Sequence, residues 1–351
     1  MVIKFFPKYT KKGASSRYRI YQYQSYFKKY NCKIYPFFDS DYKPAISYRN
    51  LKGLSYLSKL YIKKIIQILL IKRKDLVFVQ YEFTPFLPYN TFFFMFFKIR
   101  YIVDFDDAAF HDYDQHKNAI VRTLFQHKIE KVIKNASHVI TGSPYLTAYA
   151  TKYNNNITEI PTSIDLKKYY IKEQKLMEDK FVIGWIGSST TSKNLLDLIP
   201  VFNRFMQEGI NFELRFIGFD KKLSKNFVGL PISIIDWSEA TELLEIHKFS
   251  VGIMPLEKNQ FNNGKCAFKL IQYMACLQPT ISTPLEANVK VDKGNGNLFA
   301  STEDEWYSAL KEVQLDPIKF RGIGLKNRKI IEDFYSIQAN SESYLNLFKN
   351  F

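Results

Sequence analysis

Short apolar segments alternate with longer amphipathic segments along this chain, and no other feature limits its possible folds as much. In the first half, six short apolar runs are predicted strands: Val2–Phe6, Lys33–Phe37, Leu76–Gln80, Tyr101–Phe105, His138–Thr141 and Ile157–Ile160. Amphipathic stretches between them predict helices at Arg17–Tyr30, Tyr56–Lys72 and Ala119–Ile133. Strands separated by helices of this length predict a parallel sheet covered on both faces.

The second half restarts the same alternation after a polar, charged segment at 161–180. Its predicted strands are Lys180–Gly187, the alternating run around Phe212–Phe216, Ser250–Pro255 and Pro279–Thr283. The run Thr302–Glu305 has the capping-box pattern that opens a helix. Since 351 residues correspond to about two domains, the sequence predicts two α/β halves joined near 161–180.

Charge is distributed unevenly along the chain. Lys and Arg number 50 against 34 Asp and Glu, and the whole excess of +16 lies in the first 100 residues. This asymmetry indicates a polyanionic partner for the first half, although a Lys-rich coding bias is the alternative. A content of 46% hydrophobic residues excludes a disordered or fibrous protein.

Targeting and redox signals are few. Three Cys are too few for a disulfide scaffold, which fits a reducing compartment. No apolar run has the length of a membrane span or of a signal-peptide core. We therefore expect a cytoplasmic protein, with peripheral binding to the inner face of the plasma membrane left open.

The first candidate site is the polar run Gly187–Asn194, between a predicted strand and a predicted helix. Backbone N–H groups at the start of a helix bind phosphate well, and Lys193 would add a full positive charge. The run is not a Walker A loop, because no Gly precedes the Lys and Asn194 replaces Ser or Thr. It fits either a phosphate site or an ordinary Ser/Thr-rich helix start.

The second candidate is the segment Asn262–Ala275, in which a turn at Asn263–Gly264 leads into a helix. On that helix, Lys265, Lys269 and Gln272 would share one face. Two cations one turn apart repel each other unless an anion lies nearby. The segment therefore predicts either an anion-binding face or a solvated basic face.

The third candidate, Asp104–Asp112, directly follows an apolar strand and gathers four carboxylates with the imidazole of His111. Open α/β sheets bind ligands at the carboxyl ends of their strands. The cluster fits a Mg²⁺ or Mn²⁺ site, a set of partners for sugar hydroxyls, or a solvated turn.

The fourth candidate is Lys11–Arg19, between the first strand and the first helix. Small residues there, among them Gly13 and Ser16, permit close approach of the backbone. Arg17 or Arg19 could then clamp a phosphate.

In this order, these segments resemble the glycosyltransferase family 4 group of GT-B enzymes, over nearly the whole chain. The likeness is strongest in FVIGWIGSSTTSKNLLDL, DWSEATELLEIHKFSVGIMPL, NNGKCAFKLIQYMACLQPTISTPLEANVKV and GNGNLFASTEDEWYSAL. In the first half it rests on YIVDFDDAAF, ASHVITGSPYLTAYA and ITEIPTSID. The resemblance implies an α/β protein with two Rossmann-like, doubly wound parallel-sheet domains facing across a cleft. The acceptor-binding domain is expected at 1–167 and the nucleotide-sugar-binding domain at 168–334, with a helix at about 335–351 packed back on the first.

The resemblance also implies roles for individual residues. In the family, the donor diphosphate lies against the loop matched here by Gly187–Lys193, and Ser188 replaces the usual Arg. Two glutamates separated by seven residues are usual, and Gly264 and Gln272 stand in their places. The expected donor-binding residues are thus Gly187, Ser188, Lys193, Lys265, Lys269 and Gln272.

The resemblance places the catalytic and acceptor residues in the first half. Those expected to orient sugar or acceptor hydroxyls are Asp106, Asp107 and His111. The expected phosphate or acceptor loop contains Gly13, Ser16 and Arg17. The run Asp104-Phe105-Asp106 looks like the metal-binding Asp-x-Asp of GT-A enzymes, and we interpret it as coincidental.

The implied activity is transfer of a sugar from a nucleotide-sugar donor, with retention, to a lipid-linked or glycan acceptor in bacterial surface polysaccharide synthesis. No cofactor is expected and no metal is required, because cations would stabilise the leaving diphosphate. Three alternatives stay open: a catalytically silent relative that acts as a binding partner, a basic nucleic-acid-binding protein, and another nucleotide-sugar enzyme such as an epimerase. We expect no nucleic-acid partner, since the chain carries no nucleic-acid-binding motif.

A membrane surface is the polyanion that best fits a lipid-linked acceptor. The cations expected to bind it lie on the predicted 54–75 helix and at its end: Lys59, Lys63, Lys64, Lys72, Arg73 and Lys74. The aromatic run Phe92–Phe97 fits either a core helix or shallow insertion into the membrane.

Overall fold

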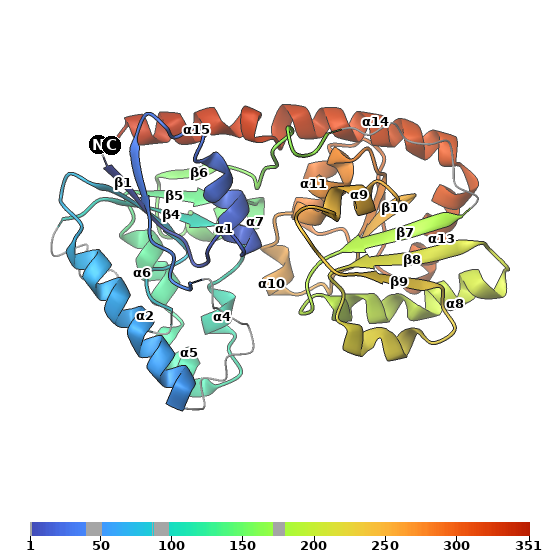
Figure 1. Cartoon of the computed structure of the whole chain (residues 1–351), viewed down its shortest axis with the longest axis horizontal. Coiled ribbons are helices and arrows are strands. Elements are labelled where there is room, and N and C mark those ends of the chain that lie inside the picture. Colours follow the sequence, from blue (N-terminus) through green and yellow to red (C-terminus); the bar gives the residue numbers. More distant parts are fainter. Residues whose placement is uncertain (1, 40–50, 86, 88–97, 171–179) are drawn as a thin grey trace. The chain divides into compact units, whose positions relative to one another are not determined.

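The computed structural model describes residues 2–39, 51–85, 87, 98–170 and 180–351 of the chain. They form two compact units, each built around one parallel sheet (Figure 1). Unit 1 comprises Met1–Thr162, Gly264–Cys266 and Asn340–Phe351, and unit 2 comprises Ser163–Asn263 and Ala267–Ala339. The prediction of two α/β halves with doubly wound parallel sheets is confirmed. The aromatic run Phe92–Phe97 lies outside the described residues, as does part of the linker at 161–180.

Within the described residues, the sheet of unit 1 has six parallel strands in the order β2-β1-β3-β4-β5-β6. The strands are β1 (Val2–Phe6), β2 (Asn31–Ile34), β3 (Leu76–Gln80), β4 (Tyr101–Phe105), β5 (His138–Thr141) and β6 (Ile157–Glu159). The helices are α1 (Ala14–Arg19), η1 (Tyr21–Tyr23), α2 (Leu51–Leu69), α4 (His111–Asp114), α5 (Ala119–Phe125), α6 (Lys128–Lys134) and α7 (Pro144–Ala150). The strand order reverses between β1 and β3, which makes the carboxyl ends of these strands the expected ligand site.

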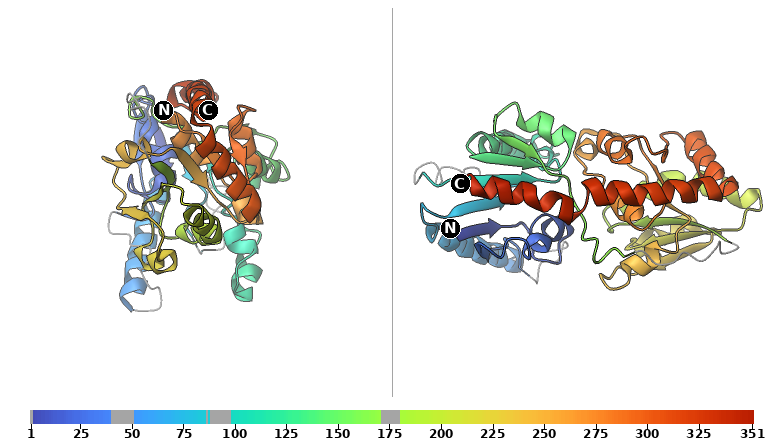
Figure 2. Two further views of the ribbon diagram at one scale, coloured as in Figure 1. Left: turned by 90° about the vertical axis from the view of Figure 1, so that its right-hand side faces the viewer. Right: turned by 90° about the horizontal axis from the view of Figure 1, so that it is seen from above.

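Both faces of this sheet are buried, as a parallel sheet requires. On β3, Val77 and Val79 pack under the helices of one face, with α6 and α7. Phe78 points to the other face, where α15 (Ile337–Lys349) lies along the strands (Figure 2). There the rings of Tyr344 and Phe348 contact Phe78, with centroids 6.3 Å apart in each pair. The last residues of the chain therefore complete the core around a strand from its first quarter.

The sheet of unit 2, within the described residues, runs β12-β11-β10-β7-β8-β9, again all parallel. Its strands are β7 (Phe181–Ile186), β8 (Phe212–Ile217), β9 (Ile232–Ile235), β10 (Val251–Met254), β11 (Thr280–Ser282) and β12 (Leu298–Phe299). Its helices are η2 (Ser192–Leu198), α8 (Ile199–Gln207), η3 (Lys221–Phe227), α9 (Glu242–Ile246), α10 (Gln260–Asn263), α11 (Phe268–Ala275), α12 (Glu286–Asp292), α13 (Glu303–Leu315) and α14 (Pro317–Phe334). The order reverses between β7 and β10, the Rossmann arrangement of a dinucleotide-binding sheet.

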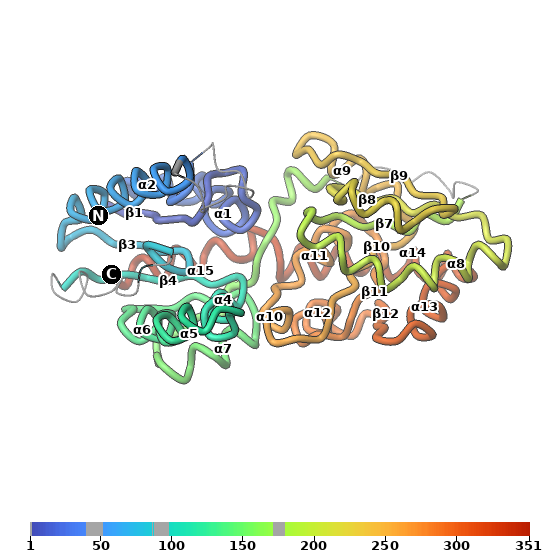
Figure 3. The backbone as a smooth tube through the Cα atoms, turned by 90° about the horizontal axis from the view of Figure 1, so that it is seen from below, coloured from blue at the N-terminus to red at the C-terminus, as the bar shows by residue number. Residues whose placement is uncertain are grey.

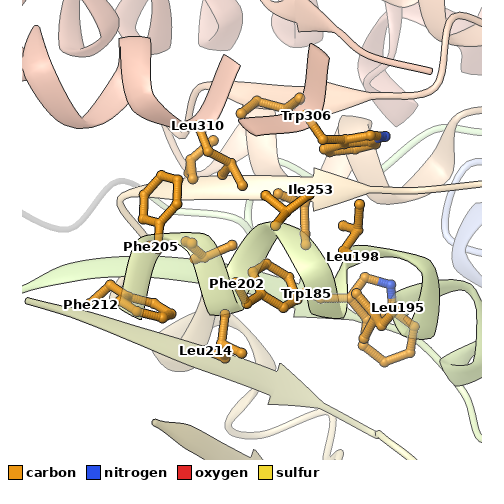
Figure 4. Close-up of a cluster of buried hydrophobic side chains, with 14 of the residues drawn as sticks. Trp185, Leu195, Leu198, Phe202, Phe205, Phe212, Leu214, Ile253, Trp306 and Leu310 are labelled. Atoms are coloured by element: carbon orange, nitrogen blue, oxygen red, sulfur yellow. The ribbon is translucent and has the colours of Figure 1, made fainter. Parts of the chain in front are cut away.

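Helices α8 and α13 cover one face of this sheet, which Figure 3 shows from below, and α11 and α14 cover the other. Under α8, Phe202 and Phe205 meet Trp185 and Leu214 of the strands, and Trp306 and Leu310 come from α13 (Figure 4). The predicted capping box opens α13, since the Thr302 hydroxyl accepts a hydrogen bond from the Glu305 amide at 3.3 Å. Within the described residues, no helix has the length and hydropathy needed to cross a bilayer.

Several element boundaries differ from the sequence predictions. The predicted strand Lys33–Phe37 is found at Asn31–Ile34, because Phe37 leaves the sheet edge and packs with Phe38 against Leu60. The predicted helix Arg17–Tyr30 is α-helical only up to Arg19, and the chain continues as the 3₁₀ segment η1 and then as turns. Strands β9 and β12 were not predicted.

Lys64 corrects the predicted set of lipid-binding cations. Its side chain is 2% exposed, and its ammonium donates to the Tyr35 carbonyl at 2.7 Å and lies 4.8 Å from the centre of the Phe6 ring. Burial, with Lys63 alongside, lowers the pKa of Lys64 to about 7. Lys64 is therefore an interior residue of unit 1, on the face of α2 opposite to solvent.

A buried ion pair fixes the carboxyl edge of the unit 1 sheet. Arg19 at the end of α1 donates from Nε to Asp104 of β4 at 3.0 Å, and a second guanidinium nitrogen reaches the other carboxylate oxygen. The same guanidinium donates to the Ile160 carbonyl, just after β6, at 2.7 Å. One side chain thus ties together α1, β4 and the end of β6, and both charges are fully buried.

We predict that Arg19→Met lowers the free energy of unfolding by about 3–5 kcal/mol, because it leaves the Asp104 charge buried without its partner. The double variant Arg19→Met/Asp104→Leu should recover most of this loss, since both charges are then removed. Urea unfolding at neutral pH measures both. A single variant that costs less than about 1 kcal/mol would contradict this account of the pair.

Candidate functional site

Two glycines bring the backbones of neighbouring strands together at the switch point of unit 2. Gly187 directly follows β7, and Gly218 directly follows β8 with a φ of +71°. A Cβ on Gly218 would lie 2.3 Å from the Gly187 carbonyl oxygen, and one on Gly187 would lie 2.3 Å from the Trp185 ring. Neither position has room for a side chain, so the loop after β7 presents bare backbone to whatever binds there.

Hydroxyl groups shape the predicted phosphate loop that follows Gly187. The Ser188 amide donates to the Thr191 hydroxyl at 3.2 Å, and the Ser192 hydroxyl donates to the Ser188 carbonyl at 3.1 Å. The loop leads into η2, a 3₁₀ segment that precedes α8, so a regular α-helix does not begin where the sequence predicted one. Lys193 lies in the first turn of η2 and is exposed.

Lys269 lies beside the same loop. It is in the first turn of α11, and its ammonium is 5.4 Å from the centre of the Trp185 ring. The Trp185 ring is also the group that bars a side chain at Gly187. The structure therefore places Lys269 near the Gly187 loop.

Lys265 corrects the predicted shared helix face. Ala267 has a φ of +53°, and α11 begins only at Phe268, so Lys265 lies outside the helix. Lys265 belongs to unit 1, where its ammonium is 2.8 Å from Asp107. The predicted i, i+4, i+7 face thus keeps Lys269 and Gln272 but loses Lys265.

Gln272 is buried in a hydrogen-bond chain that the sequence did not indicate. Its amide donates to the Tyr169 hydroxyl at 2.8 Å, and that hydroxyl donates to Glu242 at 2.9 Å. The other oxygen of Glu242 accepts from the Trp237 indole at 2.6 Å. Trp237 follows β9, and its Cβ lies beside Gly218. This tethered ring, 39% exposed, is a flat apolar surface at the carboxyl edge of the unit 2 sheet.

Carboxylates gather at the carboxyl ends of β3 and β4 in unit 1, as the third candidate predicted. Asp106 is buried and accepts a hydrogen bond from the Tyr81 hydroxyl, which follows β3. Asp107 is partly exposed and is held by Lys265. Tyr81 was not predicted, although its place directly after a strand is the signal that could have revealed it.

Burial controls the protonation of this group. Burial and the neighbouring Asp107 raise the pKa of Asp106 to about 6, against a lowering by Arg19. Burial and Asp106 raise the pKa of Tyr81 well above its ordinary value, so its phenol keeps the proton that it donates. Burial has the largest single effect on the pKa of Lys265 and lowers it, but Asp107 and Asp106 together hold that pKa above its ordinary value, so the ammonium stays charged. Asp106 is thus a carboxyl group that gains and loses its proton near pH 6.

The segment Gly264–Cys266 packs tightly against this carboxylate loop. The Cys266 thiol donates to the Asp106 carbonyl at 3.0 Å, and a Cβ on Gly264 would lie 2.5 Å from the Cβ of Ala108. A glutamate at position 264 therefore cannot be accommodated in this arrangement.

The other predicted residues of unit 1 take structural positions. His111 lies in α4 between Asp114, at 2.8 Å, and the Tyr145 hydroxyl, at 2.9 Å. The Ser16 hydroxyl is fully buried and donates to Gln80 at the end of β3 at 2.6 Å. The Gly13 amide closes a turn with the Thr10 carbonyl, and the Arg17 guanidinium lies 4.8 Å from the centre of the Tyr18 ring. Gly13 and Ser16 thus shape the β1–α1 loop at the switch point of unit 1.

A metal site was one interpretation of the carboxylate cluster. Across the part of the chain that the structure describes, no three His, Cys, Asp or Glu side chains are grouped in a way that could hold a metal ion.

Known proteins match this chain in structure but not in sequence. No protein-family model matches the chain, and no curated protein matches it in sequence. Solved structures do match. Sucrose-phosphate synthase from Thermosynechococcus elongatus has a TM-score of 0.73 at 12% identity, over 100% of this chain and 98% of that chain. HepE from Anabaena, in complex with UDP, has a TM-score of 0.72 at 12% identity, over 100% of both chains.

A third match is WaaG, a glycosyltransferase involved in lipopolysaccharide biosynthesis, with a TM-score of 0.69 at 11% identity over 99% of both chains. The chain has the GT-B fold. The likeness spans both Rossmann-like sheets, so the GT-B prediction made from sequence is confirmed. At 11–12% identity, the roles of individual residues in this GT-B protein rest on its own geometry.

We predict that folded stability falls as the pH rises from about 4 to about 6, by up to about 3 kcal/mol, through Asp106. The raised pKa means that the unfolded chain loses this proton first, so unfolding becomes easier across that window and the effect levels off above it. Urea unfolding from pH 4 to 7 should show this slope in the wild type and not in Asp106→Asn.

Tyr81→Phe tests the same assignment by raising the pKa of Asp106 instead of removing its carboxyl group. The Tyr81 hydrogen bond lowers the pKa of Asp106, so its removal should extend the slope to higher pH. An identical pH profile for wild type and Asp106→Asn would contradict the assignment.

Proposed function

We propose that the chain is a glycosyltransferase that takes a nucleotide-sugar donor at the switch point of unit 2. The observation that carries the proposal is the paired bare backbone of Gly187 and Gly218 with Lys269 beside it, and with the exposed Lys193 in the segment that follows. Close backbone approach with added cations is the arrangement that binds a diphosphate. The matching structures support this interpretation, since HepE was solved with UDP and with UDP-glucose.

Charge development during the reaction gives these cations their role. Cleavage of the bond between sugar and phosphate leaves a nucleoside diphosphate with growing negative charge. Lys193 and Lys269 would stabilise that charge as it forms. We propose that they do so without a metal ion, so full activity is expected in EDTA.

The nucleoside part of the donor fits the carboxyl edge beside Gly218. The Trp237 ring is fixed by Glu242 and offers one apolar face, on which a nucleobase can stack. Gln272 helps to fix the Trp237 ring indirectly, because it donates to Tyr169, which donates to Glu242. We propose that it acts in this way and not through a direct contact with the donor. We take UDP as the first nucleotide to test because of the HepE complexes.

The carboxylates of unit 1 suit an acceptor that offers hydroxyl groups. Asp106 receives one hydrogen bond from Tyr81, and its pKa of about 6 leaves it mostly ionised at neutral pH, so it can accept a second hydrogen bond from an attacking hydroxyl. Asp107, fixed by Lys265, can orient a neighbouring hydroxyl. Attack on the face that the diphosphate leaves would give retention without an enzymatic nucleophile. We propose a lipid-linked or glycan acceptor in surface polysaccharide synthesis, which the basic first 100 residues support.

A catalytically silent relative is the second candidate function. Steric exclusion of a glutamate at Gly264 favours it, because the family pattern places an acidic side chain there. Such a protein would bind a nucleotide without turning over its sugar. The two experiments below separate binding from turnover.

We predict that UDP raises the melting temperature of the wild type without added metal. At about 100 times its dissociation constant, a ligand stabilises the fold by about 2.7 kcal/mol. Lys193→Ala and Lys269→Ala should each reduce the shift, because each removes a cation beside the diphosphate. The matched control is Lys326→Ala on α14, an exposed lysine that should leave the shift unchanged. No shift with UDP, GDP, ADP or CMP would count against the proposed function.

We predict that Asp106→Asn lowers kcat about 100-fold or more, while its UDP-induced thermal shift equals that of the wild type. Release of UDP from UDP-sugars with a panel of glycan acceptors measures turnover, with and without EDTA. If the wild type binds UDP but releases no UDP from any UDP-sugar, the result would favour the catalytically silent relative. Activity lost in EDTA and restored by Mn²⁺ would overturn the metal-independent mechanism.

A further inference from the structure

Helix α2 has apolar side chains on two opposite faces, which is unusual for a helix at the surface of a protein. One face is buried, with Leu60 and Lys64 turned into unit 1 and Leu57 packed against the Phe37–Phe38 cluster. A surface helix normally presents polar residues on its other side. Here the outward apolar residues, each 49% to 63% exposed, are Leu54, Ile62, Ile65, Ile66, Leu69 and Leu70.

Five of these side chains, from Ile62 on α2 to Leu70 just after it, are exposed together as a stripe, whereas the exposed Ser55 and Ser58 separate Leu54 from them. Ile62, Ile65, Ile66 and Leu69 stand at i, i+3, i+4 and i+7, the spacing of a single helix face. Single exposed aliphatic residues are ordinary on a protein surface, but a contiguous row of them indicates an interaction site. Figure 1 shows α2 at the margin of unit 1, with its length open to one side.

Positive charge borders the stripe. At 100° per residue, Lys52, Lys59 and Lys63 fall on one flank of it, and all three are exposed. Lys72, Arg73 and Lys74 follow the helix directly and are exposed as well. The sequence from Leu51 to Lys74 contains no Asp or Glu, and the next acidic residue, Asp75, is buried against Lys4 at 2.8 Å.

We propose that α2 is a docking helix that lies in the plane of an anionic lipid surface and inserts its outward apolar stripe. An apolar stripe bordered by cations is the pattern of an interfacial helix, since the aliphatic groups enter the acyl boundary while the lysines meet lipid phosphates. As a route to a lipid-linked acceptor, this docking rests on the proposed function. The surface itself depends only on α2.

Other occupants fit the stripe less well. An antiparallel two-fold pairing of α2 with a second copy of this chain would place the lysine flanks of both helices on the same side of the interface, which like-charge repulsion opposes. Nucleic acid would offer phosphates to the lysines but would leave the six aliphatic side chains exposed to water. An anionic membrane satisfies both parts of the surface at once.

Vesicle sedimentation tests the proposal with the full chain. Vesicles of phosphatidylcholine alone are compared with vesicles that contain about one-third phosphatidylglycerol, at about 50 mM and about 500 mM NaCl. The wild type should bind the anionic vesicles at low salt and bind the neutral ones weakly. Absence of binding to anionic vesicles at low salt would overturn the proposal.

Two variants separate the apolar and charged contributions. Ile62→Ser/Ile66→Ser/Leu69→Ser should weaken binding to anionic vesicles about tenfold or more at both salt concentrations. Lys59→Gln/Lys63→Gln should weaken it about thirtyfold at low salt and less at high salt. The matched control is Leu325→Ser, an exposed aliphatic residue on α14 of unit 2, which should bind as the wild type does. Equal binding by the triple variant and the wild type would overturn insertion of the stripe.

A gain-of-signal variant keeps the test independent of lost folding. The indole emission of Ile66→Trp, after subtraction of the wild-type spectrum, should shift to the blue when anionic vesicles are added and stay unchanged with neutral ones. An unchanged spectrum with bound vesicles would overturn the proposal. So would concentration-dependent self-association in the wild type that the triple variant abolishes.

The same variants keep this proposal distinct from the proposed function. Their UDP-induced thermal shifts should equal that of the wild type, because α2 contributes nothing to the donor residues of unit 2. If vesicle binding behaves as expected while no nucleotide binds, the docking surface stands and the glycosyltransferase proposal fails. The opposite result leaves the transferase and removes the docking surface.

Discussion

The ion pair between Arg19 and Asp104 is the constraint on which unit 1 depends. A guanidinium and a carboxylate buried from water are costly unless each finds its partners, and here one arginine satisfies both Asp104 and the Ile160 carbonyl. This requirement sets the distance between α1 and β4. It therefore also sets where the chain emerges from β4, at Asp106 and Asp107, and where α1 leaves the loop that Gly13 and Ser16 shape.

Both units carry polar groups at the carboxyl ends of their strands, but the groups are cationic in unit 2 and anionic in unit 1. In each, the carboxyl ends of the strands near the switch point carry the polar groups. Unit 2 offers bare backbone at Gly187 and Gly218 with lysines beside it, which suits an anion. Unit 1 offers carboxylates, which suit neutral hydroxyl groups and repel a diphosphate. The contrast assigns the phosphate-bearing substrate to unit 2 and the hydroxyl-bearing substrate to unit 1 in the proposed function.

Sequence patterns predicted the buried centre of each sheet well and its edges poorly. Central strands such as β3 and β4 are buried on both faces, so they are continuous apolar runs that propensity recognises. Edge strands β9 and β12 are only half-buried and very short, and their pattern is weak.

The positive φ at Ala267 has no signal in residue type, which is why Lys265 was placed on a helix. Lys64 was misplaced because composition gives charge but not the direction in which a lysine points. Trp237 and Tyr81 depend on contacts between distant segments, and a single sequence does not contain those contacts.

The return of α15 to unit 1 has a consequence for how the protein is made. The rings of Tyr344 and Phe348 close the face that carries Phe5 and Phe78, yet they are synthesised after all of unit 2. At about 5–20 residues per second, the ribosome needs roughly ten to thirty-five seconds to make residues 163–339. During that interval the first unit to emerge keeps an aromatic face uncovered. The half of the chain that is made first is thus the half that finishes folding last, and any chaperone that protects the nascent protein would find its binding surface there.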